Sequence, residues 1–458
     1  MNWILELDLL SGPLPVAISL LGAAALGFLL ARRSGRWLLF AAASAAAAFL
    51  LAWIACWAAI HVFFLWSEDL PLRVVAVVAL VLWAVALGGT TALAGVRRRG
   101  TRRRAAATVP AAPWPAPSPA PTLRRRLLAV LSTAVIFLTA ATALNVMYGD
   151  TPTVGALLGR HPQAIEEPPP ALQHAGAPLF MGTSVAARWQ ASPGLPAEGR
   201  VLSVPIPGTE SGLAARNAVV YLPPAYAAAK RPILPVLVLV AGQPGSPESW
   251  LRSTSLVHQL DAFAAAHRGL APLVVIPDPN GSDNANTMCM DSALGRADTY
   301  MAVDVPAWIK AHLDADSNPA HWAVGGFSYG GTCSLQMATR HPELFHTFMA
   351  ISPEREPALA VQRSVTVDRA FGGDAAAFDA QLPLTWLAEH KYPQTHGWFA
   401  AGAQDATYSA NVKTLRAAAD AAGMTTGGAS FPGGHTWAVA SEALPQGFRF
   451  VFPRLGLS

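Results

Sequence analysis

Charged residues are scarce in this chain of 458 residues. Asp, Glu, Lys and Arg together make up 13% of it, whereas 52% of the residues are hydrophobic. Ordinary soluble domains carry about 25% charged residues, so this composition excludes a chain that is soluble along its whole length. We therefore expect part of the sequence to lie in a membrane.

Cysteine is also rare, with three residues, and the 12 histidines are scattered. No group of Cys and His has the spacing of a zinc site. The polar stretch at residues 277–284 lacks the spacing of a calcium loop and is interpreted as a solvated loop. The sequence therefore predicts neither a metal site nor another cofactor.

Four long apolar segments lie in the first third of the chain, at about residues 15–31, 38–60, 74–96 and 127–147. A membrane-spanning helix needs about 20 apolar residues, so residues 1–147 are predicted to form a membrane domain of four transmembrane helices. The first segment follows Glu6 and Asp8 instead of the basic residues that open a secretory signal. We therefore expect it to be retained as a helix.

Arginines mark one side of these segments. They follow the first segment and fill a Pro/Ala/Arg-rich loop at residues 97–126, whereas Glu68 and Asp69 lie between the second and third segments. Basic residues stay in the cytoplasm, which places this loop inside. The pattern predicts a multi-pass protein of the plasma membrane, with its N-terminus and everything after residue 147 outside the cytoplasm.

The charge balance differs between the two parts of the chain. Residues 1–150 carry 13 arginines and 5 acidic residues, whereas residues 151–458 carry 19 basic and 23 acidic residues. Runs of arginine can bind nucleic acid, but beside apolar segments they favour orientation and contact with anionic lipids. We expect membrane lipids and no nucleic acid as partners, and the sequence leaves the oligomeric state open.

The part outside the membrane alternates between two kinds of segment. Residues 148–200, with three consecutive prolines at 168–170, are interpreted as an extracytoplasmic linker, and residues 201–458 as one domain. Alternation of strands and helices predicts an α/β fold, a mostly parallel sheet with helices on both faces. The expected strands are 216–221, 232–240, 273–277, 322–325, 347–351 and 397–401, and the expected helices include 248–266, 299–315 and 408–422.

Ser328 lies at the centre of a G-x-S-x-G sequence, Gly326 to Gly330. Apolar residues precede it as in a buried strand, and residues 332–340 are predicted to form a helix. A serine on such a sharp strand-to-helix turn exposes its hydroxyl, which is the setting of a catalytic nucleophile. A structural turn is the alternative.

An acid and a base follow in the chain. Asp405 comes just after the predicted strand 397–401, and His435 lies in a Gly-rich loop before a final helix. Ser, Asp and His in this order are typical of α/β-hydrolases. The imidazole takes the proton of the serine, and the carboxylate orients the imidazole. Asp374 and Asp379 are alternative acids, but neither follows a strand end; Asp405 could also simply cap the next helix.

Two backbone N–H groups are needed to stabilise a negatively charged oxygen in such a site. We assign them to Gln243, in the loop after strand 232–240, and to Tyr329, the residue after the nucleophile. Pro244 has no N–H group, which narrows the choice in that loop. The side chains of Trp250, Tyr329 and Trp437 are expected to contact the substrate, with plain packing as the alternative.

Cys289 and Cys333 are the only cysteines in the predicted outer domain. Cys333 lies on the helix after Ser328, and Cys289 lies in the polar loop after strand 273–277. Both loops reach the same edge of the sheet, and an oxidising environment permits a bond. We predict a disulfide that supports the turn at Ser328; two buried free thiols are the alternative.

Three segments resemble the esterase D-like serine esterases of the α/β-hydrolase fold, a family that includes mycolyltransferases. They are residues 239–242 with the following Pro-Gly loop and Trp250, residues 326–331, and residues 433–437. The resemblance covers about residue 201 to the C-terminus. It implies Ser328 as nucleophile, Asp405 as acid and His435 as base. Ala241 replaces the histidine that many such esterases carry, and Tyr329 replaces the usual methionine of mycolyltransferases.

These observations predict a membrane-anchored esterase outside the cytoplasm that hydrolyses carboxylic esters through an acyl-serine intermediate. Lipid or cell-envelope acyl esters are the expected substrates, because a membrane anchor raises their local concentration. An acyltransferase that moves the acyl group to a sugar or glycolipid is the first alternative. A membrane scaffold that binds without catalysis is the second.

Overall fold

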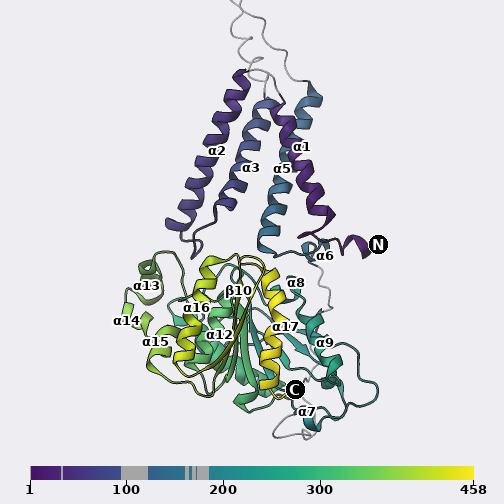
Figure 1. The fold of residues 1–458 in the computed structure, drawn as a ribbon, viewed down its shortest axis with the longest axis vertical. Helices are drawn as coiled ribbons and strands as arrows, with labels where there is room; N and C mark the ends of the chain where they lie inside the picture. Colours follow the sequence, from purple (N-terminus) through teal and green to yellow (C-terminus); the bar gives the residue numbers. More distant parts are fainter. Residues whose placement is uncertain (1, 32–34, 94–121, 160–164, 168–171, 173–184) are drawn as a thin grey trace, which may run out of the picture. The chain divides into compact units, whose positions relative to one another are not determined.

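A computed structural model shows the chain as two units, Met1–Met147 and Tyr148–Ser458 (Figure 1). The structure describes residues 2–31, 35–93, 122–159, 165–167, 172 and 185–458. Most of the predicted loop 97–126 and two of the arginines after the first apolar segment, Arg32 and Arg33, lie outside the described residues.

Within its described residues, the first unit contains four apolar helices, and each overlaps a predicted span. They are α1 (Pro13–Leu30), α2 (Gly35–His61), α3 (Leu72–Leu93) and α5 (Leu123–Tyr148), preceded by a 3-10 turn at Asn2–Ile4. All four are long and apolar enough to cross a membrane. At 1.5 Å per residue, even the 18 residues of α1 extend about 27 Å, close to the thickness of a bilayer core.

Hydrogen bonds between helices join this unit. The Trp83 indole N–H of α3 donates to the Ala41 carbonyl of α2 at 3.0 Å, and the Thr139 hydroxyl of α5 donates to the Ile18 carbonyl of α1 at 3.1 Å. At Gly22 of α1, an added Cβ would lie 2.9 Å from Thr139 Cβ. Small residues therefore let the backbones approach closely, as is common in membrane helix pairs.

The second unit is built on a nine-stranded sheet with the order β1-β2-β3-β5-β4-β8-β9-β10-β11. The β2-β3 and β3-β5 pairs are antiparallel and the other pairs are parallel. The strands are β1 (Ile165–Glu166), β2 (Arg200–Val204), β3 (Ala218–Leu222), β4 (Val236–Val240), β5 (Leu273–Ile276), β8 (Trp322–Phe327), β9 (Thr347–Ile351), β10 (His396–Gly402) and β11 (Thr425–Phe431). A separate hairpin joins β6 (Asp291–Ser292) to β7 (Gly295–Arg296).

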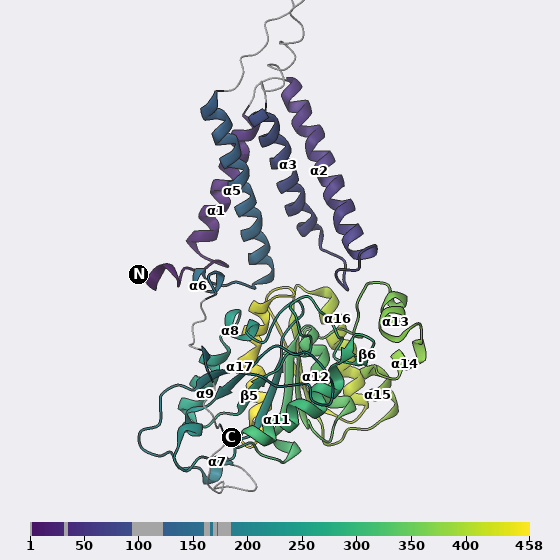
Figure 2. The same cartoon turned by 180° about the vertical axis from the view of Figure 1, so that it is seen from behind.

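Helices cover both faces of this sheet (Figures 1 and 2). Helices α9 and α17 pack together on one face, and α12, α15 and α16 form a packed series on the other. The helices are α6 (Val154–Leu157), α7 (Val185–Arg188), α8 (Ser249–Arg252), α9 (Leu256–Ala266), α10 (Ala297–Thr299), α11 (Val305–His312), α12 (Tyr329–Arg340), α13 (Arg363–Phe371), α14 (Ala375–Asp379), α15 (Pro383–Glu389), α16 (Ala406–Ala421) and α17 (Trp437–Arg454).

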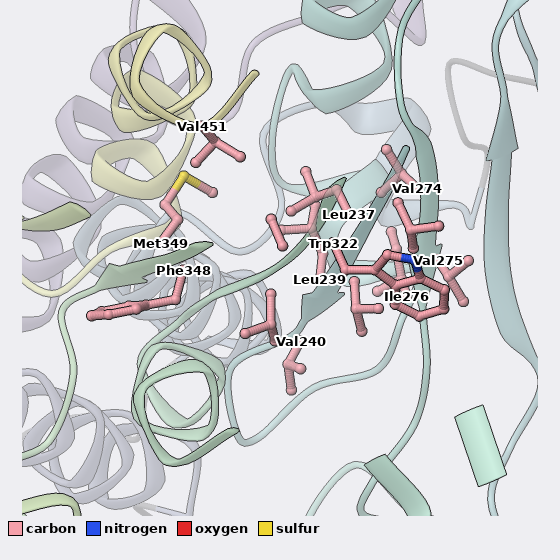
Figure 3. Close-up of a cluster of buried hydrophobic side chains, with 14 of the residues drawn as sticks. Leu237, Leu239, Val240, Val274, Val275, Ile276, Trp322, Phe348, Met349 and Val451 are labelled. Atoms are coloured by element: carbon pink, nitrogen blue, oxygen red, sulfur yellow. The ribbon is translucent and has the colours of Figure 1, made fainter. Parts of the chain in front are cut away.

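The central strands are continuous apolar runs because both of their faces are buried. All five residues of β4, from Val236 to Val240, are buried, and Leu237 pairs with Val274 of β5 in the register of the sheet (Figure 3). The unit therefore has the predicted α/β-hydrolase fold. Its parallel strands bring the loops that follow β4, β8 and β10 to one edge.

The described residues of the predicted linker, residues 148–200, belong to the second unit. Strand β1 pairs with β2, and Trp189 is buried with its indole N–H donating to the Arg268 carbonyl at 2.9 Å. Polar and proline-rich sequence concealed this packing. The folded unit begins at Tyr148 instead of residue 201.

Candidate active site

The turn at Ser328 is a strained connection between β8 and α12. Ser328 has φ 58° and ψ −120°, a conformation that is rare for a residue with a side chain, and its N–H donates to the Ile351 carbonyl at 2.9 Å. A Cβ added to Gly326 would lie 2.3 Å from the carbonyl group of Gly330. A Cβ added to Gly330 would lie 2.0 Å from the carbonyl oxygen of Val240. Only glycine fits on either side of this serine.

His435 lies directly beside the serine hydroxyl. Its Nε2 is 2.8 Å from Ser328 Oγ. The imidazole stacks on the Phe327 ring, with centroids 4.9 Å apart, and meets the Tyr408 ring with centroids 3.9 Å apart. These two aromatic rings fix the plane of the imidazole, so that the nitrogen remains aimed at the hydroxyl.

Asp405 performs two structural tasks at once. Its Oδ2 is 3.2 Å from His435 Nδ1, and its Oδ1 accepts the Tyr408 N–H at 3.1 Å as the N-cap of α16. The cap that the sequence offered as an alternative is therefore present together with the histidine contact. A hydrogen on Nδ1 that donates to the carboxylate leaves Nε2 free to accept the serine proton.

The loops that carry the acid and the base are joined along their backbones. The Ala403 N–H donates to the Phe431 carbonyl at 2.7 Å, and the Gln404 N–H donates to the Gly433 carbonyl at 2.9 Å. At Gly402 an added Cβ would lie 2.4 Å from the Gly433 carbonyl oxygen. This close approach requires glycine at the end of β10 and holds Asp405 near His435.

The loop after β4 reaches the serine from the other side. An added Cβ at Gly242 would lie 3.6 Å from Ser328 Cβ, and Gln243 follows directly. Tyr329 opens α12, where the first N–H groups have no partner within the helix. The roles of the Gln243 and Tyr329 N–H groups as oxyanion donors remain a prediction.

A partly buried ion pair supports this loop and was missed by sequence reasoning. Arg216 donates to the carboxylate of buried Asp278, with Nε at 2.7 Å, and to the Gly245 carbonyl at 2.9 Å. It also pairs with Asp283, whose carbonyl accepts the Gly245 N–H at 3.0 Å. The guanidinium thus ties the loop after β4 to the loop after β5. An arginine at the start of one strand carries no sequence signal for such a contact.

The three aromatic side chains that are expected to contact the substrate are all buried. Trp250 is completely buried and its indole N–H donates to the Val240 carbonyl at 3.1 Å, while Trp437 is buried against Trp250 and Phe327. The Tyr329 side chain is also buried, and burial raises the pKa of its hydroxyl. Each of the three side chains has a packing or hydrogen-bond partner within the protein, and their contact with substrate stays a prediction.

The two alternative acids have other partners. Asp374 caps α14 by accepting the Ala377 N–H at 2.9 Å, and Asp379 pairs with Arg363. Sequence analysis did not identify Tyr408 and Phe327 as neighbours of the histidine. Tyr408 lies three residues after the capping Asp405, a spacing that places it on the first turn of α16.

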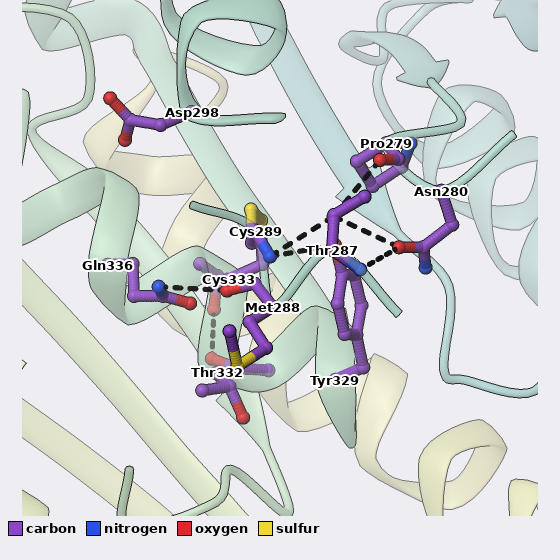
Figure 4. Close-up of a disulfide and its surroundings, with 12 residues drawn as sticks. Pro279, Asn280, Thr287, Met288, Cys289, Asp298, Tyr329, Thr332, Cys333 and Gln336 are labelled. Atoms are coloured by element: carbon purple, nitrogen blue, oxygen red, sulfur yellow. Dashed lines mark hydrogen bonds between the residues drawn. A yellow bond between two sulfur atoms is a disulfide. The ribbon is translucent and has the colours of Figure 1, made fainter. Parts of the chain in front are cut away.

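The predicted disulfide between Cys289 and Cys333 is present, and it connects the loop after β5 to α12 (Figure 4). The Tyr329 hydroxyl accepts the Cys289 N–H at 3.0 Å and contacts the Thr287 hydroxyl at 2.9 Å. The Gln336 amide donates to the Met288 carbonyl at 3.0 Å. Three side chains of α12 therefore hold one short segment, residues 287–289, beside the nucleophile turn.

Within the described residues, no group of three or more His, Cys, Asp or Glu side chains could hold a metal ion. The fold and the Ser-His-Asp arrangement at the strand ends define a serine hydrolase of the α/β-hydrolase class. A family model described as "Putative esterase" matches residues 214–451, which is more than half of the chain. The chain belongs to this esterase family.

A relative from Corynebacterium glutamicum, described as an uncharacterized protein, is 33% identical over 344 residues. The match covers 73% of this chain and 78% of the relative. Among solved structures, a ferulic acid esterase is 18% identical with a TM-score of 0.48, covering 56% of this chain and 98% of its own. An S-formylglutathione hydrolase from Agrobacterium tumefaciens is 17% identical with a TM-score of 0.46, covering 57% and 97%.

Proposed function

We propose that this protein is a membrane-anchored serine esterase that hydrolyses carboxylic esters outside the cytoplasm. Lipid or cell-envelope acyl esters are its substrates, and membrane lipids surround its four apolar helices. The single observation that carries the proposal is the hydrogen-bonded chain from Ser328 Oγ through His435 to Asp405, with contacts of 2.8 and 3.2 Å. Such a chain activates a serine hydroxyl that is otherwise a poor nucleophile.

The proposed reaction has two steps. Ser328 Oγ bonds to the ester carbonyl carbon while its proton passes to His435 Nε2. The oxygen that becomes negative accepts hydrogen bonds from the Gln243 and Tyr329 N–H groups. The alcohol then leaves with the proton from His435, and an acyl-serine remains. Water, deprotonated by His435, attacks this ester, and the carboxylic acid is released as Ser328 regains its proton.

Two features support an outside location. Apolar helices with arginines on one side orient the chain by the distribution of positive charge. The Cys289–Cys333 bond belongs to an oxidising compartment. Mass mapping of these cysteines in freshly isolated membranes, without reductant, tests the location; free thiols there would contradict it.

A fluorophosphonate probe tests the enzymatic proposal on the full-length protein in detergent. We expect the wild-type chain to be labelled and Ser328→Ala to lose labelling and all ester hydrolysis, a decrease of about 10⁵-fold or more. Ser317→Ala, which removes an exposed serine in the loop before β8, is the matched control and should behave like wild type. Equal labelling of Ser328→Ala and wild type would contradict the role of this serine.

Product analysis then separates hydrolysis from acyl transfer. With an ester and a sugar acceptor present together, the proposal expects free carboxylic acid as the main product. A dominant acylated sugar would identify the protein as an acyltransferase with the same acyl-serine step. Absence of both products and of probe labelling would leave a binding or scaffold role.

A further inference from the structure

The chain passes from the last apolar helix into the second unit without a spacer. Helix α5 ends at Tyr148, and Gly149 already lies against the start of α17. Gly149 has φ +70°, and an added Cβ there would lie 3.3 Å from the Ala438 nitrogen and 3.7 Å from the Trp437 nitrogen. We call residues 149–151 the strap.

The strap also contacts the segment that follows the loop after β4. Asp150 Oδ1 accepts a guanidinium N–H of Arg252 at 3.2 Å, and the Asp150 carbonyl accepts the Ser253 hydroxyl at 2.5 Å. Arg252 in turn donates to the Ser249 hydroxyl, which accepts the Ser246 N–H at 3.1 Å. The strap therefore lies between the segment after the proposed oxyanion loop and the helix after the catalytic histidine.

These contacts limit how far the active site lies from the end of α5. His435 precedes Trp437 by two residues, and a chain extends at most about 3.6 Å per residue, so the His435 backbone lies within roughly 12 Å of Gly149. The headgroup layer on each side of a bilayer is about 5–8 Å thick. This upper limit from Gly149, the residue that follows α5, is about twice the thickness of one headgroup layer.

Two exposed leucines follow the strap. Leu157 and Leu158, at the end of the short helix α6, are each 65% exposed. Thr153 caps this helix by accepting the Ala156 N–H. Large apolar side chains are rarely left adjacent and open to water, whereas they insert readily into a membrane interface. Because they follow the end of α5 by only nine and ten residues, we expect these two side chains to contact the bilayer surface.

We propose that the strap keeps the active site at the bilayer surface, so that the substrate is an acyl ester of a lipid resident in the same membrane. This inference rests on the proposed esterase function and restricts it. The ester group of a membrane lipid lies at the level of the headgroups, within the reach set by the strap. Esters in the cell wall or dissolved in the surrounding medium are then poor substrates compared with esters held in the membrane that anchors the protein.

Lengthening the connection tests the proposal. A flexible Gly/Ser linker of about 20 residues, inserted between Tyr148 and Gly149, has a mean span of about 25 Å and leaves the contacts of the strap with the second unit intact. The full-length protein is reconstituted into phosphatidylglycerol vesicles that contain dioleoylglycerol. Release of oleic acid measures the membrane ester, and p-nitrophenyl acetate measures a soluble ester.

We expect the insertion to lower oleic acid release by about tenfold or more, because effective concentration falls steeply with tether length. Hydrolysis of the soluble ester should stay unchanged. The matched control carries the same linker at Gly194, in an exposed turn where an added Cβ meets nothing within 4 Å. That variant should release oleic acid like wild type.

Each other outcome has a defined meaning. Unchanged oleic acid release after insertion at residue 148 would overturn the inference, as would a wild-type protein that hydrolyses only the soluble ester. If the insertion lowers both activities, the Leu157→Ser/Leu158→Ser variant decides, because it leaves the strap untouched; a loss confined to the membrane ester supports the inference and no loss overturns it. Failure of the wild-type protein on both esters, without probe labelling, refutes the esterase proposal itself.

Discussion

The two units of this protein place their apolar side chains in opposite ways. Of 35 large hydrophobic residues that are exposed in the described chain, 30 belong to residues 1–147. The second unit buries most of its Val, Leu, Ile and Phe residues around the sheet. The first buries alanines and a few large side chains such as Leu87 and Ile136 between its helices, but most of its Leu, Phe and Trp side chains are exposed. The first unit thus has the apolar surface that a lipid environment requires and the second has the buried core of a water-exposed domain, and changes in one unit should leave the other intact.

The largest expected effect is a loss of catalytic activity without a loss of stability in either unit. Asp405→Asn should lower kcat by about 10³-fold or more, because an amide N–H toward Nδ1 forces the wrong tautomer on His435. Asparagine caps helices as well as aspartate does, so the unfolding midpoint should stay the same. Ester hydrolysis and thermal unfolding measure the two roles separately.

Asp374→Asn is the control, since this residue also caps a helix and was an alternative acid. It should retain full activity. A large loss of activity in Asp374→Asn, or a large loss of stability in Asp405→Asn, would contradict this division of roles.

The next effect should be confined to the second unit. Replacing Cys289 and Cys333 by serine opens a loop with a sequence separation of 44 and should lower the free energy of unfolding by about 2–4 kcal/mol. Urea-induced loss of ester hydrolysis, with and without reductant, measures the change. Cys56→Ser, in α2, is the control that should not shift this midpoint; insensitivity of the wild-type midpoint to reductant would argue against the bond.

A change of intermediate size should be confined to the first unit. Gly22→Leu drives a side chain into Thr139 of α5 and should destabilise the helix packing by about 1–3 kcal/mol. Gly27→Leu, on the same helix, meets nothing within 4 Å and should be neutral. Thermal aggregation in detergent compares the variants, while hydrolysis of a soluble ester should remain normal in both. Equal behaviour of the two would disprove the close approach at Gly22.

The smallest effect concerns pH. Burial lowers the pKa of His341, but contact with the Asp298 carboxylate at 3.1 Å outweighs it, and the pKa is raised. A raised pKa in the folded state stabilises the protein below the ordinary value of about 6.5, and this contribution is lost as pH rises through the raised value. Relative to His341→Gln, wild type should lose at most about 1 kcal/mol of stability from pH 6 to 8 in chemical unfolding. If the free energies of unfolding of wild type and His341→Gln changed equally with pH, the contribution of His341 would be refuted.

The sequence predicted the four apolar helices and the central strands because both depend on continuous apolar runs. It also predicted that Ser328, Asp405 and His435 lie together, since each follows a strand, and the structure places them within hydrogen-bond distance. Strand β11, with the sequence Thr-Thr-Gly-Gly-Ala-Ser-Phe, escaped prediction because it has no apolar pattern and gains its stability from pairing with β10. Trp250 shows another limit of sequence reasoning. Its indole N–H needs a hydrogen-bond partner, and the sequence does not indicate that the Val240 carbonyl is this partner.

The backbone contacts between the ends of β10 and β11 have a mechanical consequence. Asp405 and His435 lie on two loops that backbone hydrogen bonds join directly, whereas Ser328 lies on the separate turn after β8. Thermal motion should therefore change the distance between the Ser328 hydroxyl and the His435 imidazole more than the distance between that imidazole and the Asp405 carboxylate. Sensitivity to distant substitutions should accordingly concentrate in the step that removes the serine proton.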